Sequence, residues 1–211
     1  MKTVLLTGFE HFGGDSLNSS EEVSRQLNGS TIARHRVVAG LLPCVFGAAT
    51  KELKHLIKLH EPQLVLCLGQ AGGRAAITPE RVAINVADAR IADNAGQKPI
   101  DQPVVKDGPA AYWSTLPIKA IVQALQKNGN PAAVSQSAGT FVCNHVFYGL
   151  MHELRAQQRI RGGLIHVPYL PEQTEDKPNL ALPVMSRAIA VAIEVSLLRS
   201  RDLRLAGGAT L

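Results

Sequence analysis

Cys143 is the residue whose type and position best suit nucleophilic chemistry. It follows a glycine-containing stretch, 137–142, and directly precedes a helix predicted over 144–158. At a helix N-terminus, free backbone N–H groups and the helix dipole favour a thiolate and can hold a developing oxyanion. Cys44 also begins a predicted helix, so this position does not by itself identify the nucleophile. Cys67 lies within an apolar strand, and we expect it to be a packing residue.

His166 is the histidine best placed to act as a base. It lies near the end of a predicted strand, just before Pro168. Alternatively, His166 is a buried core residue whose hydrogen bonds are satisfied and which takes no part in chemistry. An imidazole is the usual base for a thiol, and the carboxyl end of a strand is where ligand sites form in sheets of this type. His145 and His152 share a helix face without a third ligand at zinc spacing, so we expect no metal.

A cysteine and histidine pair usually needs a third group that orients the imidazole. Glu80 is one candidate, because it follows a proline turn at the start of an apolar strand, whereas most other glutamates lie on charged helix faces. Asp88 and Asp93 compete with it, and the residues alone leave the choice open. We expect Arg81 or Arg90 to form an ion pair with whichever carboxylate is buried.

The apolar pattern predicts strands that alternate with helices. The predicted strands cover 3–7, 36–42, 64–68, 81–88, 132–137 and 163–167, and the predicted helices cover 19–27, 45–60, 117–127, 144–158 and 183–199. This alternation indicates an α/β fold, a single domain over 1–211 with three layers, α/β/α, and a largely parallel, twisted central sheet. Ligand sites then lie at the carboxyl ends of the strands, where the segments at Gly8, Gly69 and His166 leave the sheet.

Three local features complete the expected organisation. Ser19 and Glu22 have the spacing of a capping box at the start of the first helix. Residues 89–113 are rich in Asp, Asn, Gly and Pro and too long for a silent connector, so we expect a lid or an interface segment. The tail after about residue 205 has nothing evident to hold it, and we expect it to fray.

Composition and charge bound the class of protein. The 211 residues include 22 Lys and Arg against 17 Asp and Glu, a net charge of +5 with His neutral. With 45% hydrophobic and 18% charged residues, the chain is globular, and disordered, collagen-like and low-complexity classes are excluded. The basic residues are dispersed, with no run of five, so we expect no nucleic-acid partner.

The cysteines and the apolar runs bear on the compartment. Three widely separated cysteines do not form a disulfide framework. We find no signal-peptide pattern at the start of the chain, and no apolar run approaches the roughly 18 residues of a membrane span. We therefore expect a reduced, cytoplasmic protein without a membrane partner.

Five stretches, in the order in which they occur, carry a resemblance to a known family. They are Gly8–Gly14, Thr78–Asn85, Asp107–Tyr112, Ser137–His145 and Ile165–Gln173. Together they resemble pyroglutamyl peptidase type I, the pyrrolidone-carboxylate peptidases. The resemblance implies a cysteine peptidase that removes an N-terminal pyroglutamyl residue from peptides, a cytosolic homotetramer with no metal and no cofactor. The chain differs at His11 and Ser19, where the family commonly has proline.

The resemblance also implies roles for individual residues. It implies Cys143 as nucleophile, His166 as general base and acid, and Glu80 as the group that orients the imidazole. The substrate is a five-membered lactam, whose pocket needs apolar walls and a few amide partners. For this pocket the resemblance implies Phe9 and Phe141 as flanking rings, with Asn18, Gln70 and Val142 near the polar atoms, and Phe12 lies in the same group of loops. We expect the oxyanion to be held by the backbone N–H of Cys143 with help from Gln70 or Arg90.

Other functions remain open from the residues alone. A different small-molecule α/β enzyme, such as a nucleoside phosphorylase or an amidase, would use the same glycine-rich loops, but the phosphate-binding pattern Gly-x-x-x-x-Gly-Lys is missing from the sequence. A binding protein without catalysis would have an inert Cys143, which a thiol reagent distinguishes from a reactive one.

Overall fold

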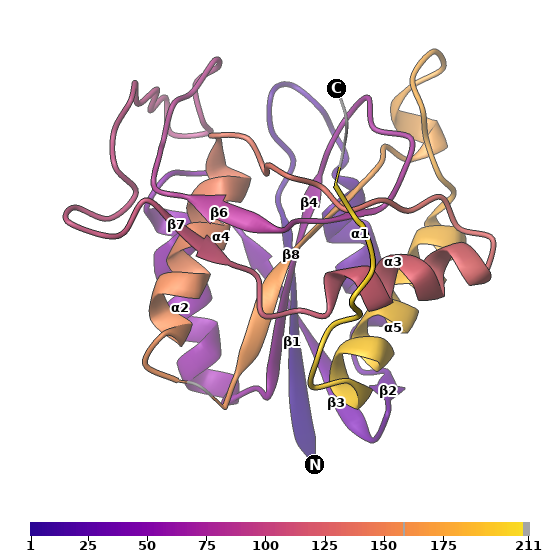
Figure 1. Cartoon of the computed structure of the whole chain (residues 1–211). Helices are drawn as coiled ribbons and strands as arrows, with labels where there is room; N and C mark the ends of the chain where they lie inside the picture. Colours follow the sequence, from indigo (N-terminus) through magenta and orange to yellow (C-terminus); the bar gives the residue numbers. More distant parts are fainter. Residues whose placement is uncertain (158, 209–211) are drawn as a thin grey trace.

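The central sheet has the order β2-β3-β1-β4-β8-β5 in the computed structural model, which describes residues 1–157 and 159–208 (Figure 1). The bounds are β1 (Lys2–Phe9), β2 (Thr31–Ile32), β3 (His35–Leu42), β4 (Leu64–Gln70), β5 (Thr78–Pro79) and β8 (Arg161–Val167). β3, β1, β4 and β8 run parallel, and the two-residue strands β2 and β5 pair antiparallel at the edges. The predicted single-domain α/β fold with a largely parallel sheet is confirmed.

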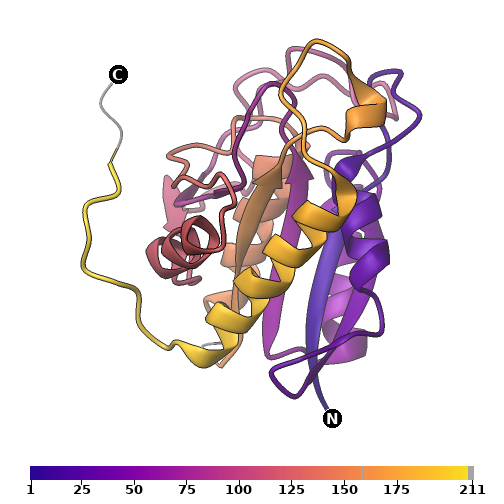
Figure 2. The same ribbon diagram turned by 90° about the vertical axis from the view of Figure 1, so that its right-hand side faces the viewer.

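Helices cover both faces of the sheet. Figure 1 shows α2 (Ala48–His60) and α4 (Val142–Leu154) on one side of the sheet. On the other side lie α1 (Ser19–Leu27), α3 (Ile118–Lys127) and α5 (Leu182–Leu198), and Figure 2 shows α5 lying lengthwise along that face. A two-stranded ribbon of β6 (Val82–Ile84) and β7 (Ala111–Trp113) packs against α4. Within the described residues, no helix combines the length and apolar character needed to traverse a bilayer.

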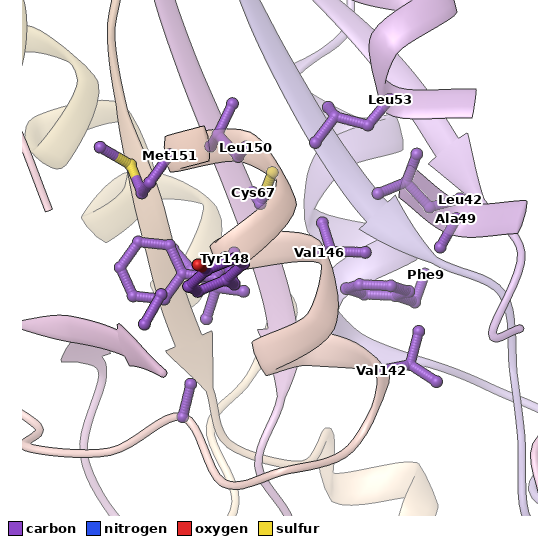
Figure 3. Close-up of a cluster of buried hydrophobic side chains, with 14 of the residues drawn as sticks. Phe9, Leu42, Ala49, Leu53, Cys67, Val142, Val146, Tyr148, Leu150 and Met151 are labelled. Atoms are coloured by element: carbon purple, nitrogen blue, oxygen red, sulfur yellow. The ribbon is translucent and has the colours of Figure 1, made fainter. Parts of the chain in front are cut away.

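Two apolar cores hold the layers together. Successive residues of a strand point to opposite faces, so Leu5 and Val65 pack toward α2 and α4 while Leu6 and Leu66 pack toward α1, α3 and α5. Because both faces are covered, the strands are continuous apolar runs rather than alternating ones. Figure 3 shows the first core, which includes Phe9 among its buried side chains.

The parallel strands bring three loops to one edge of the sheet. β1, β4 and β8 are neighbours, so their carboxyl ends lie side by side. Gly69 and His166 are paired directly across β4 and β8. The start of α4 meets the same edge, as Figure 1 shows, so the predicted meeting place of the loops is confirmed.

Two strand predictions are wrong in detail. Residues 132–137 form no strand; their backbone pairs only through two isolated bridges, Ile77 to Ala132 and Glu80 to Ser135. The strand predicted over 81–88 shortens to β6, which leaves the central sheet for the ribbon with β7. In both cases apolar alternation indicated extended backbone correctly but could not identify the pairing partner.

Several helix boundaries also differ from the prediction. Asn18, not Ser19, caps α1, because its Oδ1 accepts from the backbone N–H of Ser20 at 3.0 Å. α2 begins at Ala48 after Gly47, so Cys44 is not at a helix N-terminus as predicted. α4 begins at Val142 and ends at Leu154, earlier than the helix predicted over 144–158, whose last residue lies outside the described part of the chain.

The C-terminal tail passes α3 (Figure 2), and hydrogen bonds hold it through residue 207, contrary to the expectation that nothing would hold it. Asp202 accepts from the backbone N–H groups of Lys119 and Ala120, so the tail caps α3. The Leu205 carbonyl accepts from the Lys119 Nζ. The carbonyl of Gly207 accepts from Arg81 at 2.7 Å and from Gln136 at 3.1 Å. The tail prediction beyond residue 208 lies outside the described residues.

The irregular stretch 89–113 is anchored beside the loops of the sheet edge. The buried carboxylate of Asp93 accepts from the backbone N–H groups of Phe46, Ala95 and Gln97. The side chain of Asn94 donates to the loop after β1, at Glu10 Oε1 and the carbonyl of His11. These bonds tie the stretch to the loop after β1 and to the loop between β3 and α2.

Candidate active site

Cys143 and His166 face each other across Gly69. A Cβ built on Gly69 would lie 2.8 Å from His166 Nε2 and 3.0 Å from Cys143 Sγ. Both reactive atoms therefore point at the same small space, which exists because β4 has a glycine there. Cys143 is in the first turn of α4, and His166 is the penultimate residue of β8.

Glu80 lies behind His166. Its Oε1 is 2.7 Å from His166 Nδ1, and the carboxylate is completely shielded from solvent. The backbone N–H of Glu80 donates to the carbonyl of Leu164 at 2.9 Å, which attaches this segment to β8. An ionised carboxylate only accepts, so Nδ1 donates to it. In the neutral ring Nε2 is then the acceptor, and it is the nitrogen that faces Cys143.

The charge of Glu80 is balanced by its neighbours. Burial acts to raise the pKa of Glu80, but the hydrogen bond and charge of His166, with the hydrogen bond from Arg74, outweigh it and lower that pKa. Glu80 is therefore ionised at neutral pH. The expected partners of the buried carboxylate, Arg81 and Arg90, were wrong, since Arg74 forms the ion pair at 2.7 Å.

The three cysteines differ in their surroundings. All three are free thiols. Burial raises the pKa of Cys44 and of Cys67 to about 12, so both are inert at neutral pH. The pKa of Cys143 is also raised, chiefly by burial and further by the nearby Cys44 and Glu80. The charge of Arg74 opposes this rise without cancelling it. The helix start favours a thiolate, yet the resting residue is a thiol, which needs a base to react.

An aromatic wall stands beside Cys143. The ring of Phe141 lies 5.9 Å from that of Phe12 and 5.4 Å, edge to face, from that of Phe46. Phe12 and Phe141 are only partly buried, as a binding surface requires. Phe9 is different: it is 2% exposed and packs against Val142 in the core (Figure 3), so it lies below the wall.

A polar cluster surrounds Gln70, the last residue of β4. Gln70 Oε1 accepts from the backbone N–H of Ser19 at 2.8 Å and from Gln173 Nε2 at 2.8 Å. Gln173 also donates to the carbonyl of Leu17, so one side chain joins the loops after β1, β4 and β8. Both polar atoms of the Asn18 side chain are hydrogen-bonded within the protein: its Oδ1 caps α1, and its Nδ2 donates to the carbonyl of Glu10.

Three residues that the sequence analysis named as candidates, Arg90, Asp88 and Asp93, form no hydrogen bond with Cys143, His166 or Glu80 in the described part of the chain. Arg90 is exposed and forms no hydrogen bond with the described residues. Asp88 is exposed, and Asp93 anchors the stretch 89–113 as described above. No group of three or more His, Cys, Asp or Glu within the described residues is arranged to hold a metal ion.

Three residues at the site were missed by the sequence analysis: Arg74, Phe46 and Gln173. Arg74 had a detectable signal, because it follows Gly72-Gly73 immediately after a buried strand and a tight turn there returns its side chain toward the strand end. Phe46 was assigned to a helix that begins two residues later. Gln173 lies in a short 3-10 turn, Pro171–Gln173, whose pattern carries no period.

The arrangement suits acyl transfer. A thiol faces an imidazole nitrogen that can accept its proton, a buried carboxylate orients the ring, and the N-terminal N–H groups of α4 are available for an oxyanion. The aromatic rings offer apolar contacts and the polar cluster offers amide partners, and a small lactam needs both.

Comparisons with known proteins agree with this geometry. The family model for pyroglutamyl peptidase matches residues 2–199. The chain is 54% identical to a pyrrolidone-carboxylate peptidase of Bacillus cereus and 52% identical to that of Bacillus mycoides, in each case over the full length of both chains.

Solved structures show the same fold. The crystal structure of Bacillus amyloliquefaciens pyroglutamyl peptidase I has 48% sequence identity, a TM-score of 0.94 and coverage of 96% of this chain and 100% of that one. The pyrrolidone carboxyl peptidase of Thermococcus litoralis has 39% identity, a TM-score of 0.94 and coverage of 98% and 100%. With its thiol, imidazole and carboxylate meeting at the end of a parallel sheet, the chain belongs to the pyroglutamyl peptidase family.

Proposed function

We propose that this chain is a cysteine exopeptidase that hydrolyses the bond after an N-terminal pyroglutamyl residue of peptides, with Cys143 as nucleophile, His166 as general base and acid, and Glu80 as the orienting carboxylate. One observation carries the assignment of roles: Cys143 Sγ and His166 Nε2 face the same point over Gly69, while His166 Nδ1 bonds Glu80 at 2.7 Å. Family membership supports the substrate.

Acylation begins with proton transfer from Cys143 to His166. The thiolate attacks the pyroglutamyl carbonyl carbon, and the C=O electron pair moves onto the oxygen. The backbone N–H of Cys143 at the start of α4 holds this oxyanion, with help from the amide of Gln70 or from Arg90. As the tetrahedral intermediate collapses, the C–N bond breaks and His166 gives its proton to the leaving amine, which leaves a thioester on Cys143.

Deacylation repeats these steps with water. His166 takes a proton from water, the hydroxide attacks the thioester carbonyl, and the C–S bond breaks. The proton returns to the sulfur, so pyroglutamate leaves and the thiol is restored. Glu80 remains ionised throughout and stabilises the imidazolium of both steps.

The residues that line the pocket distinguish a pyroglutamyl ring from a prolyl ring. We propose that Phe12 and Phe141 flank the lactam ring, that Phe9 and Val142 form the floor, and that Gln70 bonds an amide edge of the ring. Asn18 supports this edge by capping α1, whose first residue, Ser19, donates to Gln70. A proline ring lacks the lactam carbonyl, so it leaves a buried polar partner unsatisfied and is rejected.

The test is release of a fluorogenic amine from its pyroglutamyl amide, with the prolyl amide as substrate control. We expect cleavage of the pyroglutamyl amide only, and its loss in Cys143→Ala and Cys143→Ser. Cys67→Ala is the matched control: it removes a buried thiol from the core, lowers stability, and leaves turnover in place. Unimpaired turnover by folded Cys143→Ala contradicts the nucleophile, and no cleavage by wild type under reducing conditions contradicts the function.

We propose, further, that the protein works in the cytoplasm as a homotetramer. The free thiols support a reducing compartment. Ile100 and Trp113, both within the anchored stretch 89–113, are 70% and 68% exposed, which supports a subunit contact there rather than a lid. Light scattering tests this: a mass near four times 22.6 kDa agrees with the tetramer, and a mass near 22.6 kDa contradicts it.

A further inference from the structure

Arg74 reaches the back of the candidate triad from a tight turn after β4. The turn has Gly73 at φ +91°, a conformation that other residues rarely adopt. A Cβ on Gly72 would lie 2.2 Å from the ring of Tyr169, so the turn is also pressed against the segment after β8. Both glycines therefore hold the backbone where the Arg74 side chain points back toward Glu80.

The guanidinium of Arg74 has four acceptors, reached through Nη1 and Nη2. Nη1 donates to Glu80 Oε1 at 2.7 Å, to Thr78 Oγ1 at 2.8 Å and, more weakly, to Ser135 Oγ at 3.3 Å. Nη2 donates to the carbonyl of Ser137 at 3.1 Å. The ion pair with Glu80 is thus joined to two chain segments, the one that carries Thr78 and the one that carries Ser135 and Ser137.

Arg74 and His166 meet on the same carboxylate oxygen. Both donate to Oε1 of Glu80 at 2.7 Å, whereas the buried Oε2 has no hydrogen-bond partner among the described residues. A carboxylate bound through a single oxygen can rotate, and rotation would exchange the oxygen that His166 meets. The donor from Arg74, fixed in turn by Thr78 and Ser137, opposes that rotation.

We propose that Arg74 is a positioning residue for the peptidase reaction, which fixes Oε1 of Glu80 against His166 Nδ1 and so fixes the direction in which His166 Nε2 faces Cys143. The inference rests on the function proposed above, in which Glu80 orients His166. Arg74 acts through Glu80 and does not touch the substrate, so its loss reduces the rate of the chemical step rather than substrate binding.

The charge of Arg74 has a second effect. The hydrogen bond that Arg74 donates helps to lower the pKa of Glu80, and its charge acts to lower the pKa of Cys143. Without it the carboxylate takes up a proton at higher pH, and a protonated Glu80 no longer supports the imidazolium. The acid side of the rate profile therefore moves toward neutral pH when Arg74 loses its charge.

The experiment measures kcat and KM on the pyroglutamyl amide across pH for wild type, Arg74→Met, Arg74→Lys and Arg81→Met. We expect Arg74→Met to lose on the order of 100-fold in kcat, with KM within about twofold of wild type. We expect the midpoint of the acid limb of its pH–rate profile to rise by about one pH unit. Arg74→Lys restores the position of the acid limb but only part of kcat, because an ammonium cannot reproduce the planar guanidinium contacts to Glu80 and Ser137. Added guanidinium ion raises kcat of Arg74→Met.

Arg81→Met is the matched control. Arg81 neighbours Glu80 in the chain, but its side chain bonds Gln136 and Gly207 instead. We expect an unchanged profile for it. A wild-type kcat and acid limb in Arg74→Met overturn the inference, as does a rise in KM alone. If Arg74→Met does not fold, Arg74→Lys decides, because a wild-type kcat in that variant overturns the inference too. An inactive wild type contradicts the proposed function instead, so the two failures are distinguishable.

Discussion

His166 Nδ1 lies 2.7 Å from Oε1 of Glu80, and neither side chain is more than 5% exposed. A hydrogen bond between a neutral ring and an ionised carboxylate in such a site fixes both the tautomer and the orientation of the ring. The ring nitrogen that faces Cys143 is free to accept a proton only because the other nitrogen is committed to Glu80.

Replacement of Glu80 by Gln tests this commitment. The amide can also offer an NH₂ group to Nδ1, which favours the wrong tautomer, and it does not stabilise the imidazolium. We expect kcat on the pyroglutamyl amide to fall by about 10³-fold while Cys143→Ala falls to background. A Glu80→Gln enzyme within tenfold of wild type contradicts the orienting role. Glu153→Gln, on the exposed side of α4, is the control and keeps wild-type turnover.

Acid stability should depend on the same carboxylate. The folded pKa of Glu80 is lowered below its ordinary value of 4.5, so the unfolded chain binds the proton more tightly. Its contribution to stability is therefore complete above about pH 4.5 and is lost as pH falls through the folded pKa. Urea unfolding followed by circular dichroism should show wild type more stable than Glu80→Gln by about 2 kcal/mol at pH 7, with the gap shrinking below pH 4.5. A constant gap across that range contradicts the prediction.

The space over Gly69 is needed by the chemistry. The backbone of Gly69 has no left-handed φ, so alanine is conformationally permitted, but its Cβ would press on His166 Nε2 and Cys143 Sγ. We expect Gly69→Ala to fold and to lose at least about 100-fold in kcat. Gly207→Ala, whose Cβ would meet its nearest atom at 3.4 Å, is the control. Full activity in folded Gly69→Ala would show that the two reactive atoms do not meet there.

The tail contributes to stability and not to chemistry. Asp202 accepts from the first N–H groups of α3, whose own N-cap residue, Pro117, makes no side-chain cap. We expect Asp202→Ala to cost about 1 kcal/mol and to lower Tm by about 3 °C, with unchanged kcat at 25 °C. Asp202→Asn keeps an acceptor and most of the stability. An equal loss in Asp176→Ala, at an exposed residue, would refute the capping role.

The sequence predicted the parallel core of the sheet well because strands covered on both faces are apolar throughout. Runs such as Leu64–Leu68 need no partner to be recognised, and the following glycines mark the loop edge. It could not predict β2 or β5, since two residues carry no period. The same limit applies to residues 132–137, where the extended backbone was right and the pairing was not.

The sequence predicted those parts of the candidate site that depend on a few neighbouring residues, and it did not predict contacts between residues far apart in the chain. The start of α4 identified Cys143 as a candidate, but the choice of Glu80 over Asp88 and Asp93 came from the family resemblance. Only the chain path shows that Glu80 is attached to β8 beside His166. The predicted ion-pair partner of the buried carboxylate was wrong for a related reason. Arg81 is adjacent to Glu80 in the sequence, but the turn at Gly72 and Gly73 brings Arg74 to the carboxylate instead.

Gln173 has a consequence for the response of the protein to heat. This single side chain joins the loops of three strands, and it lies in a partly exposed turn where local stability is lowest. We expect its hydrogen bonds to open on warming before the two apolar cores do, which leaves Gln70 held by Ser19 alone. We therefore expect activity to be lost at a lower temperature than the fold and to return on cooling, because the sheet and both helix layers stay assembled.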